Sequence, residues 1–200
     1  TGTGRSAKID FNNRLVTEAI SEDIKDHAAS SGDKYNINTG DITLTDATAT
    51  SVLYIKNNET ADLVITALTY NLGNSTSGTG DGLIEIHRNP TTGTIIDTTP
   101  TDVDIGTTSL ANQNFGSSRS LAIDAFKGAT ADNDFTASDG VTIPTRLSSP
   151  VGSNVVALGA VILPKGSSIG ITYTPQTSNS SQVCQFAVAC YLKTTDVTGL

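Results

Sequence analysis

The stretch VVALGAVILPKGSSIGITYTPQTSNSSQVCQFAVACYL, residues 155–192, decides the fold class of this chain. It opens with an apolar run of strand length and turns at Pro164-Lys165-Gly166. It then resumes with strand-like alternation over 168–173 and ends in a third apolar run over 183–192. Short runs of this kind, joined by tight polar turns, are typical of antiparallel strands. We therefore expect the three runs to form one antiparallel sheet.

The composition of the whole chain favours the same class. The chain has 200 residues, of which 36% are hydrophobic, and this suits one β-rich domain with one core. About a quarter of the residues are Ser or Thr, and the branched Thr side chain fits a half-exposed strand. Because we find neither an internal repeat nor a linker, we expect an extended arm over 1–14 and a single β-sandwich domain over 15–200.

Short candidate strands continue along the rest of the chain, separated by polar loops. Eight to ten short strands with long intervening loops predict an all-β fold, a jelly-roll-like antiparallel β-sandwich. Residues 97–120 and 127–140 read mainly as loops. Besides the three runs above, the candidate segments, of which 15–20, 35–37, 42–44 and 141–147 are short or weak, are 15–20, 35–37, 42–44, 51–57, 62–70, 83–88, 94–96, 121–126 and 141–147.

One short helix is expected near the N-terminus, over about ten residues. Ser21 is a good N-cap, and Glu22 and Asp23 would lie in the first turn, where acidic groups favour the helix dipole. Ile24, His27 and Ala28 follow at helical spacing, and Gly32 can end the segment.

The first 14 residues combine glycines with local positive charge on an acidic chain. Such an arm can dock onto an acidic neighbour, although a frayed terminus has the same composition. The candidate interface residues of the arm are Arg5, Lys8, Ile9, Phe11 and Arg14.

Charge and hydropathy exclude two classes of partner. The net charge is −8, and the 12 Lys and Arg residues are scattered, so we expect no direct contact with nucleic acid. No run approaches 18 apolar residues, so we expect no membrane-spanning helix. The first residues form no apolar signal segment, and an initial Thr fits removal of an initiator Met.

The two cysteines, Cys184 and Cys190, stand in one expected strand. Six residues at about 3.3 Å each separate them by roughly 20 Å, far more than the roughly 7 Å that a disulfide tolerates. We therefore expect two buried free thiols that pack as small hydrophobes, which fits a chain made in a reducing cytoplasm.

Two motifs resemble catalytic or metal sites, and each has a simpler interpretation. Gly166-Ser167-Ser168-Ile169-Gly170 matches the G-x-S-x-G nucleophile pattern, but that motif needs a helix after the Ser, and a strand follows here. Glu85 and His87 share one strand face, but no third ligand is visible. We expect that face to meet solvent or a partner.

Three further patterns resemble known sites but do not match them. Asp132-Asn133-Asp134 begins like a calcium loop, but the sixth residue is Ala137 and the twelfth is Ile143, so the EF-hand pattern fails; an irregular cation site in this loop stays open. The glycine-rich segment 78–82 precedes a strand and contains Asp81, which disfavours phosphate. The sequons at Asn58, Asn74 and Asn179 match the number expected by chance. We therefore expect no catalytic residue, cofactor or metal.

Several phrases, in this order, resemble a group of tailed-bacteriophage virion proteins. Together they cover roughly residues 12–173, and no single one is diagnostic. The phrases are NNRL and TEAI (12–15 and 17–20), GDKYNI (32–37), LYIKNNE (53–59), IHRNP (86–90), NFGSS (114–118) and LPKG (163–166).

This resemblance implies a non-enzymatic structural protein of the particle, of the head decoration or cement type. Its partners would be the major capsid protein and copies of itself, with a trimer favoured, and it would be located in the virion after assembly in the host cytoplasm. Contacts would involve the arm and the loops 71–82 and 106–120. The alternatives are a carbohydrate-binding or adhesive β-sandwich module and, with less support, a hydrolase.

Overall fold

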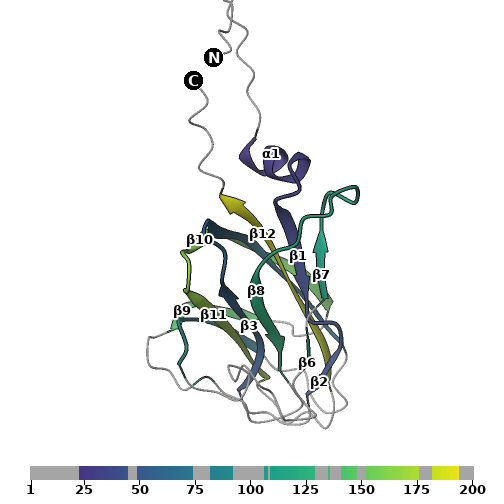
Figure 1. Ribbon diagram of the computed structural model, residues 1–200. Helices are drawn as coiled ribbons and strands as arrows, with labels where there is room; N and C mark the ends of the chain where they lie inside the picture. Colours follow the sequence, from purple (N-terminus) through teal and green to yellow (C-terminus); the bar gives the residue numbers. More distant parts are fainter. Residues whose placement is uncertain are drawn as a thin grey trace, which may run out of the picture.

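The computed structural model describes residues 23–44, 49–73, 82–91, 106–107, 109–128, 135, 141–147, 152–175 and 182–193. They form one short helix and two antiparallel sheets that pack face to face as a β-sandwich (Figure 1). The elements are α1 (Ile24–Ser30), β1 (Lys34–Asn38), β2 (Ile42–Leu44), β3 (Thr50–Asn57), β4 (Asp62–Leu72), β5 (Gly82–Arg88), β6 (Gly106–Thr107), β7 (Ser109–Asn112), β8 (Ile123–Lys127), β9 (Val141–Leu147), β10 (Gly152–Leu163), β11 (Ser168–Pro175) and β12 (Gln182–Lys193).

The strand order is that of a jelly roll. One sheet has the order β10-β4-β12-β1-β7, with β2 also paired to β12, and the other has the order β6-β8-β3-β11-β5-β9. Eight of these strands form four nested antiparallel pairs, β1 with β12, β3 with β11, β4 with β10 and β5 with β9. One long hairpin that is rolled into two sheets produces nested pairs of this kind. The predicted jelly-roll-like sandwich is therefore confirmed.

The core lies between the two sheets and alternates along each strand. Ile37, Leu68 and Val188 point inward from the first sheet, and Leu53 and Ile171 from the second, all with 0–1% of their surface exposed. Each fully buried side chain of this size contributes roughly 1.5–3 kcal/mol relative to exposure. β3 and β11 are buried along nearly their whole length, on both faces.

The prediction of one sheet over 155–192 is wrong. All three strands form, but β11 belongs to the sheet opposite the one that contains β10 and β12. The turn at 164–167, with Gly166 at a φ of 79°, carries the chain across the sandwich. Within the first sheet, β10 and β12 lie on either side of β4 and do not pair with each other. The apolar runs identified strands, but pairing is set by distant partners.

The helix and two connections also differ from expectation. α1 has seven residues, and its N-cap is Asp23, whose carboxylate accepts a hydrogen bond from the Lys25 amide at 2.8 Å, so Ser21 is not the cap. The segment expected to be loop contains β6 and β7, and β8 begins at Ile123, after a buried Leu121. Residues 1–22, including the arm and the expected strand at 15–20, lie outside the described residues, as does the expected strand at 94–96.

Candidate functional site

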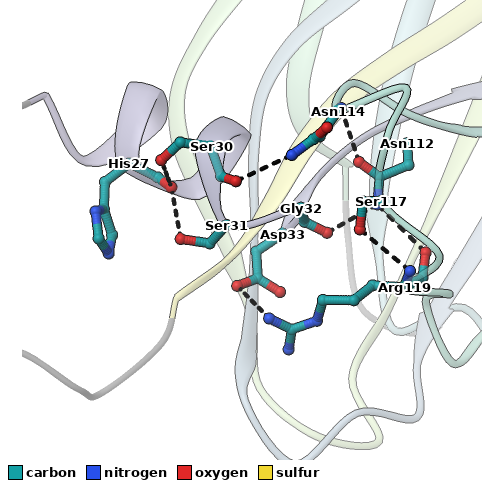
Figure 2. A network of polar contacts seen from close by, with 9 residues as sticks. All are labelled: His27, Ser30, Ser31, Gly32, Asp33, Asn112, Asn114, Ser117 and Arg119. Carbon is teal, nitrogen blue, oxygen red and sulfur yellow. Dashed lines mark hydrogen bonds and ion pairs between the residues drawn. The ribbon is translucent and has the colours of Figure 1, made fainter.

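The segment 113–120, between β7 and β8, forms an outward loop that is tied to the junction of α1 and β1 (Figure 2). We call it the Phe115 loop. The amide of Gln113 donates to the Lys34 carbonyl at 2.8 Å, which continues the pairing of β7 with β1 by one further bond. The loop therefore starts from a fixed strand end.

Two asparagines hold the loop against the end of the helix. The side-chain amide of Asn112 donates to the Gly32 carbonyl at 2.8 Å, and that of Asn114 donates to the Ser30 carbonyl at 3.0 Å. Their side-chain oxygens accept hydrogen bonds from the loop backbone, from the amides of Asn114 and Gly116. Asx turns of this type fix a local backbone shape without secondary structure.

Gly32 makes this close approach possible. Its φ of 77° is in the left-handed region, which glycine adopts at no steric cost. A Cβ at this position would lie 2.2 Å from the Ser117 hydroxyl oxygen, which itself accepts a hydrogen bond from the Arg119 amide at 3.1 Å. Gly32, which was expected to end the helix, thus also allows the Phe115 loop to pack closely against it.

An ion pair anchors the base of the loop. The Arg119 Nη1 lies 2.9 Å from the Asp33 Oδ2, and the Asp33 side chain is 2% exposed, whereas that of Arg119 is 53% exposed. No donor among the described residues reaches the Asp33 Oδ1. The Asp33 carboxylate also acts on the neighbouring Tyr35. Burial and, second, this negative charge raise the pKa of Tyr35 above its ordinary value. Arg119 is therefore the one described counter-ion bonded to this buried acid.

The tip of the loop presents an aromatic ring to solvent. Phe115 is 97% exposed, the most exposed of the large hydrophobic side chains in the described residues. Beside it lies a shallow depression of about 320 Å³, lined by Asn36, Ala111, Asn112, Gln113 and Phe115. An aromatic side chain held out by a hydrogen-bonded loop has the character of an interface anchor, because little conformational freedom is lost when it is buried.

His87 is buried rather than placed on an open face, so that prediction is wrong. It is 5% exposed, its Nε2 lies 3.0 Å from the Thr172 Oγ1, and its ring lies 5.7 Å from that of Phe135. Phe135 covers this part of the outer face of β5 and β11 and packs on Gly170 and Tyr54. The face is therefore covered by the chain itself.

The remaining sequence motifs show no catalytic arrangement. Ser168 is buried at the start of β11, and its amide donates to the Asn89 side chain at 2.8 Å, so the G-x-S-x-G match is a turn followed by a strand, as expected. No group of three or more His, Cys, Asp or Glu side chains within the described ranges could hold a metal ion. The segments 74–81 and 129–134 lie outside those ranges.

The two thiols behave as the sequence indicated. Cys184 and Cys190 are free and are 0% and 1% exposed. Burial raises the pKa of each thiol to about 12. Both point into the core between the sheets, so neither is a nucleophile at neutral pH.

The predicted contact residues of the arm, Arg5, Lys8, Ile9, Phe11 and Arg14, lie outside the described residues, as does most of the loop 71–82. Of the predicted contact segments, 106–120 is the one that the structure largely describes, and it contains Phe115. Sequence reasoning selected this loop but did not single out Phe115, Asn112 or Arg119. The signal for this loop tip in the sequence was the Asn-x-Asn pattern at 112–114, directly before an isolated Phe.

Comparisons with known proteins add no assignment. No family model matches this sequence, and no curated protein was found to be similar to it. No helix among the described residues has the length and apolar character needed to cross a bilayer.

Proposed function

We propose that this chain is a non-enzymatic structural protein of a tailed-bacteriophage particle, of the capsid decoration or cement type. In this proposal it binds the major capsid protein through the Phe115 loop and the N-terminal arm. It also associates with copies of itself, as a trimer in the favoured case, and it resides in the virion. Its work is mechanical, since the surface buried on the particle raises the free-energy cost of disruption.

The observation that carries the proposal is the fully exposed Phe115 on a loop fastened to the scaffold by side-chain hydrogen bonds. Jelly rolls occur in viral capsid proteins, but also in lectins and cupins, so the fold supports the proposal only by analogy. A rigid loop with an aromatic tip supports it more directly, because a few buried aromatic anchors dominate most protein interfaces.

The proposal is tested by whether the protein co-purifies with particles at a fixed ratio to the major coat protein. Phe115→Ala should weaken particle binding by about 2 kcal/mol or more, as expected for an anchor. Ile24→Ala is the matched control, since Ile24 is also a large exposed apolar residue, at 64%, but lies on α1. Protein that never associates with particles would overturn the proposal.

The arm is tested separately by deleting residues 1–14. Binding to particles should weaken, because the positive side chains of the arm would be lost. Unchanged binding of the deletion variant would remove the arm from the proposal and leave the Phe115 loop as the contact.

A carbohydrate-binding module is the second candidate, and one observation favours it. Phe115 lies beside a depression lined by Asn36, Asn112 and Gln113, and sugars bind to aromatic faces flanked by amides. Micromolar binding on a glycan array that Phe115→Ala abolishes would favour this candidate over the structural one.

A further inference from the structure

The outer face of the β10-β4-β12-β1-β7 sheet is unusually poor in charge. Its strands and β2 contain three charged residues, Lys34, Asp62 and Lys193, and all three stand at the same end of the sheet, next to α1. The strands of the opposite sheet carry six: Lys56, Glu85, Arg88, Asp124, Lys127 and Arg146. A sheet face that meets only water normally carries more polar and charged side chains.

The register shows how small side chains form continuous rows across this face. Ala111, Asn36, Ala189, Ala67 and Ala157 lie side by side across the five strands. On one side of this row lie Asn38, Ala187, Thr69 and Val155, and on its other side, toward α1, lie Lys34, Tyr191, Val64 and Ile162. The Asn36 and Asn38 rows, which consist mostly of Ala, Thr and Asn, give a flat surface on which another flat surface can lie closely.

Apolar side chains are exposed at the margins of this face. Val155 and Ile162 on β10 are 59% and 48% exposed, and Val183 on β12 is 45% exposed. Five strands about 4.8 Å apart, with about eight residues of about 3.3 Å along each, give a face of roughly 600 Å². Two such faces bury about 1,200 Å², the lower limit of stable specific interfaces.

We infer that this outer face binds the same chain, so that copies associate sheet to sheet through β10, β4, β12, β1 and β7. The inference rests on the self-association included in the proposed function, and because the same face serves both copies, it gives a two-fold pair in place of the favoured trimer. The area of two such faces, about 1,200 Å², suits a second copy as the occupant, and the charge of the chain restricts where copies can meet. Each copy carries a net charge of −8, so copies repel one another unless they meet through a neutral surface. A basic partner would instead bind to an acidic face of this chain.

The test places a charge in the middle of the face. Thr69 is exposed on β4, so Thr69→Arg leaves the core intact but buries an unpaired charge when two faces meet. Association should weaken by about 100-fold or more, measured by sedimentation velocity. Thr60→Arg is the matched control, because Thr60 is exposed in the connection between β3 and β4, and it should leave the assembly unchanged. Thermal unfolding of both variants checks that they remain folded.

A cross-link gives a second readout on the same face. Ala187 lies on the central strand β12, and an Ala187→Cys variant should form disulfide-linked pairs under mild oxidation. The two native thiols are buried and do not compete. Thr60→Cys should stay monomeric on a non-reducing gel.

The outcomes separate this inference from the proposed function. An assembly of unchanged size in Thr69→Arg, without a cross-link in Ala187→Cys, overturns the inference but leaves self-association intact. A wild-type chain that is monomeric at every concentration overturns both the self-association and the inference, whereas particle binding through Phe115 is measured independently.

Discussion

The side-chain amide of Asn57, at the end of β3, donates a hydrogen bond of 2.8 Å to the backbone carbonyl of Leu163, at the end of β10 in the opposite sheet. The same nitrogen also donates to the Ala61 carbonyl at 2.9 Å, and the Asn57 Oδ1 accepts from the Glu59 amide at 2.9 Å. The Asn57 backbone is bonded to Ser167 and Gly166 of the crossing turn. One fully buried residue thus fastens two connections between the sheets.

Asn57→Ala should therefore destabilise the protein strongly. The change leaves the Leu163 carbonyl without its buried partner and removes three hydrogen bonds, so we expect a loss of about 2–4 kcal/mol in the free energy of unfolding. Urea denaturation measures it. Asn58→Ala, at the exposed neighbouring residue, should cost less than about 0.5 kcal/mol. Equal effects of the two changes would contradict this role of Asn57.

Arg119→Ala should loosen the Phe115 loop more than it destabilises the domain. The Arg119 side chain is half exposed, so solvent screens part of the interaction, and we expect a loss of about 1–2 kcal/mol. Hydrogen exchange at the amides of Gly116 and Ser117 should accelerate. Arg119→Lys, which keeps the charge but not the planar group, should recover part of the protection. Unchanged exchange in Arg119→Ala would show that the asparagines alone hold the loop.

Gly170→Ala should disturb the packing of Phe135. A Cβ on residue 170 would lie 2.3 Å from the Phe135 ring, so the ring must move, at a cost of about 1–3 kcal/mol. Combining Gly170→Ala with Phe135→Ala should then cost less than the sum of the single changes, as a double-mutant cycle would measure. Gly116→Ala is the control, since its nearest contact would be an ordinary 3.5 Å.

Stability should fall in alkaline solution because of the buried thiols. Burial raises the pKa of Cys184 and Cys190 from 9.0 to about 12, and that of Tyr173 from 10.0 to about 12. These groups ionise more readily in the unfolded chain, so their contribution is complete below about pH 9 and is lost as the pH rises toward 12. Denaturation at several pH values measures the slope.

The variant Cys184→Ala/Cys190→Ala is the control for this pH effect. It should be less stable at neutral pH, because both side chains fill core volume, but its stability should depend less on pH between 9 and 12. In the folded wild-type protein, both thiols should react with a thiol reagent only as fast as the protein unfolds. Rapid labelling of either cysteine at neutral pH would contradict their burial.

Local patterns predicted the described strands except β6 and β7, since period-two alternation depends on neighbours in the sequence. They could not assign β11 to its sheet, because its partners β3 and β5 are distant in the chain. By composition alone, one apolar run is as good a partner for β11 as another. Likewise Ser21 and Asp23 are both good N-caps by residue type, and the structure uses Asp23.

The candidate site was predictable only in part. The polar composition indicated a loop over 106–120, and the part after β7 is one, but the position of Phe115 depends on bonds to Ser30 and Gly32, which lie about 80 residues earlier. The burial of His87 depends on Phe135 in the same way. Both are tertiary effects that no local spacing encodes.

The pairing of β1 with β12 determines how the domain responds to tension. Lys34, at the start of β1, lies opposite Tyr191, near the end of β12, at the end of the sheet beside α1 (Figure 1). A pull on these two strand ends therefore opens the ladder one pair at a time, like a zipper, which is the weak loading direction of a sheet. A load that enters across the flat face is instead shared by five strands at once. From this geometry we expect the domain to resist pressure on its broad side better than traction along its chain.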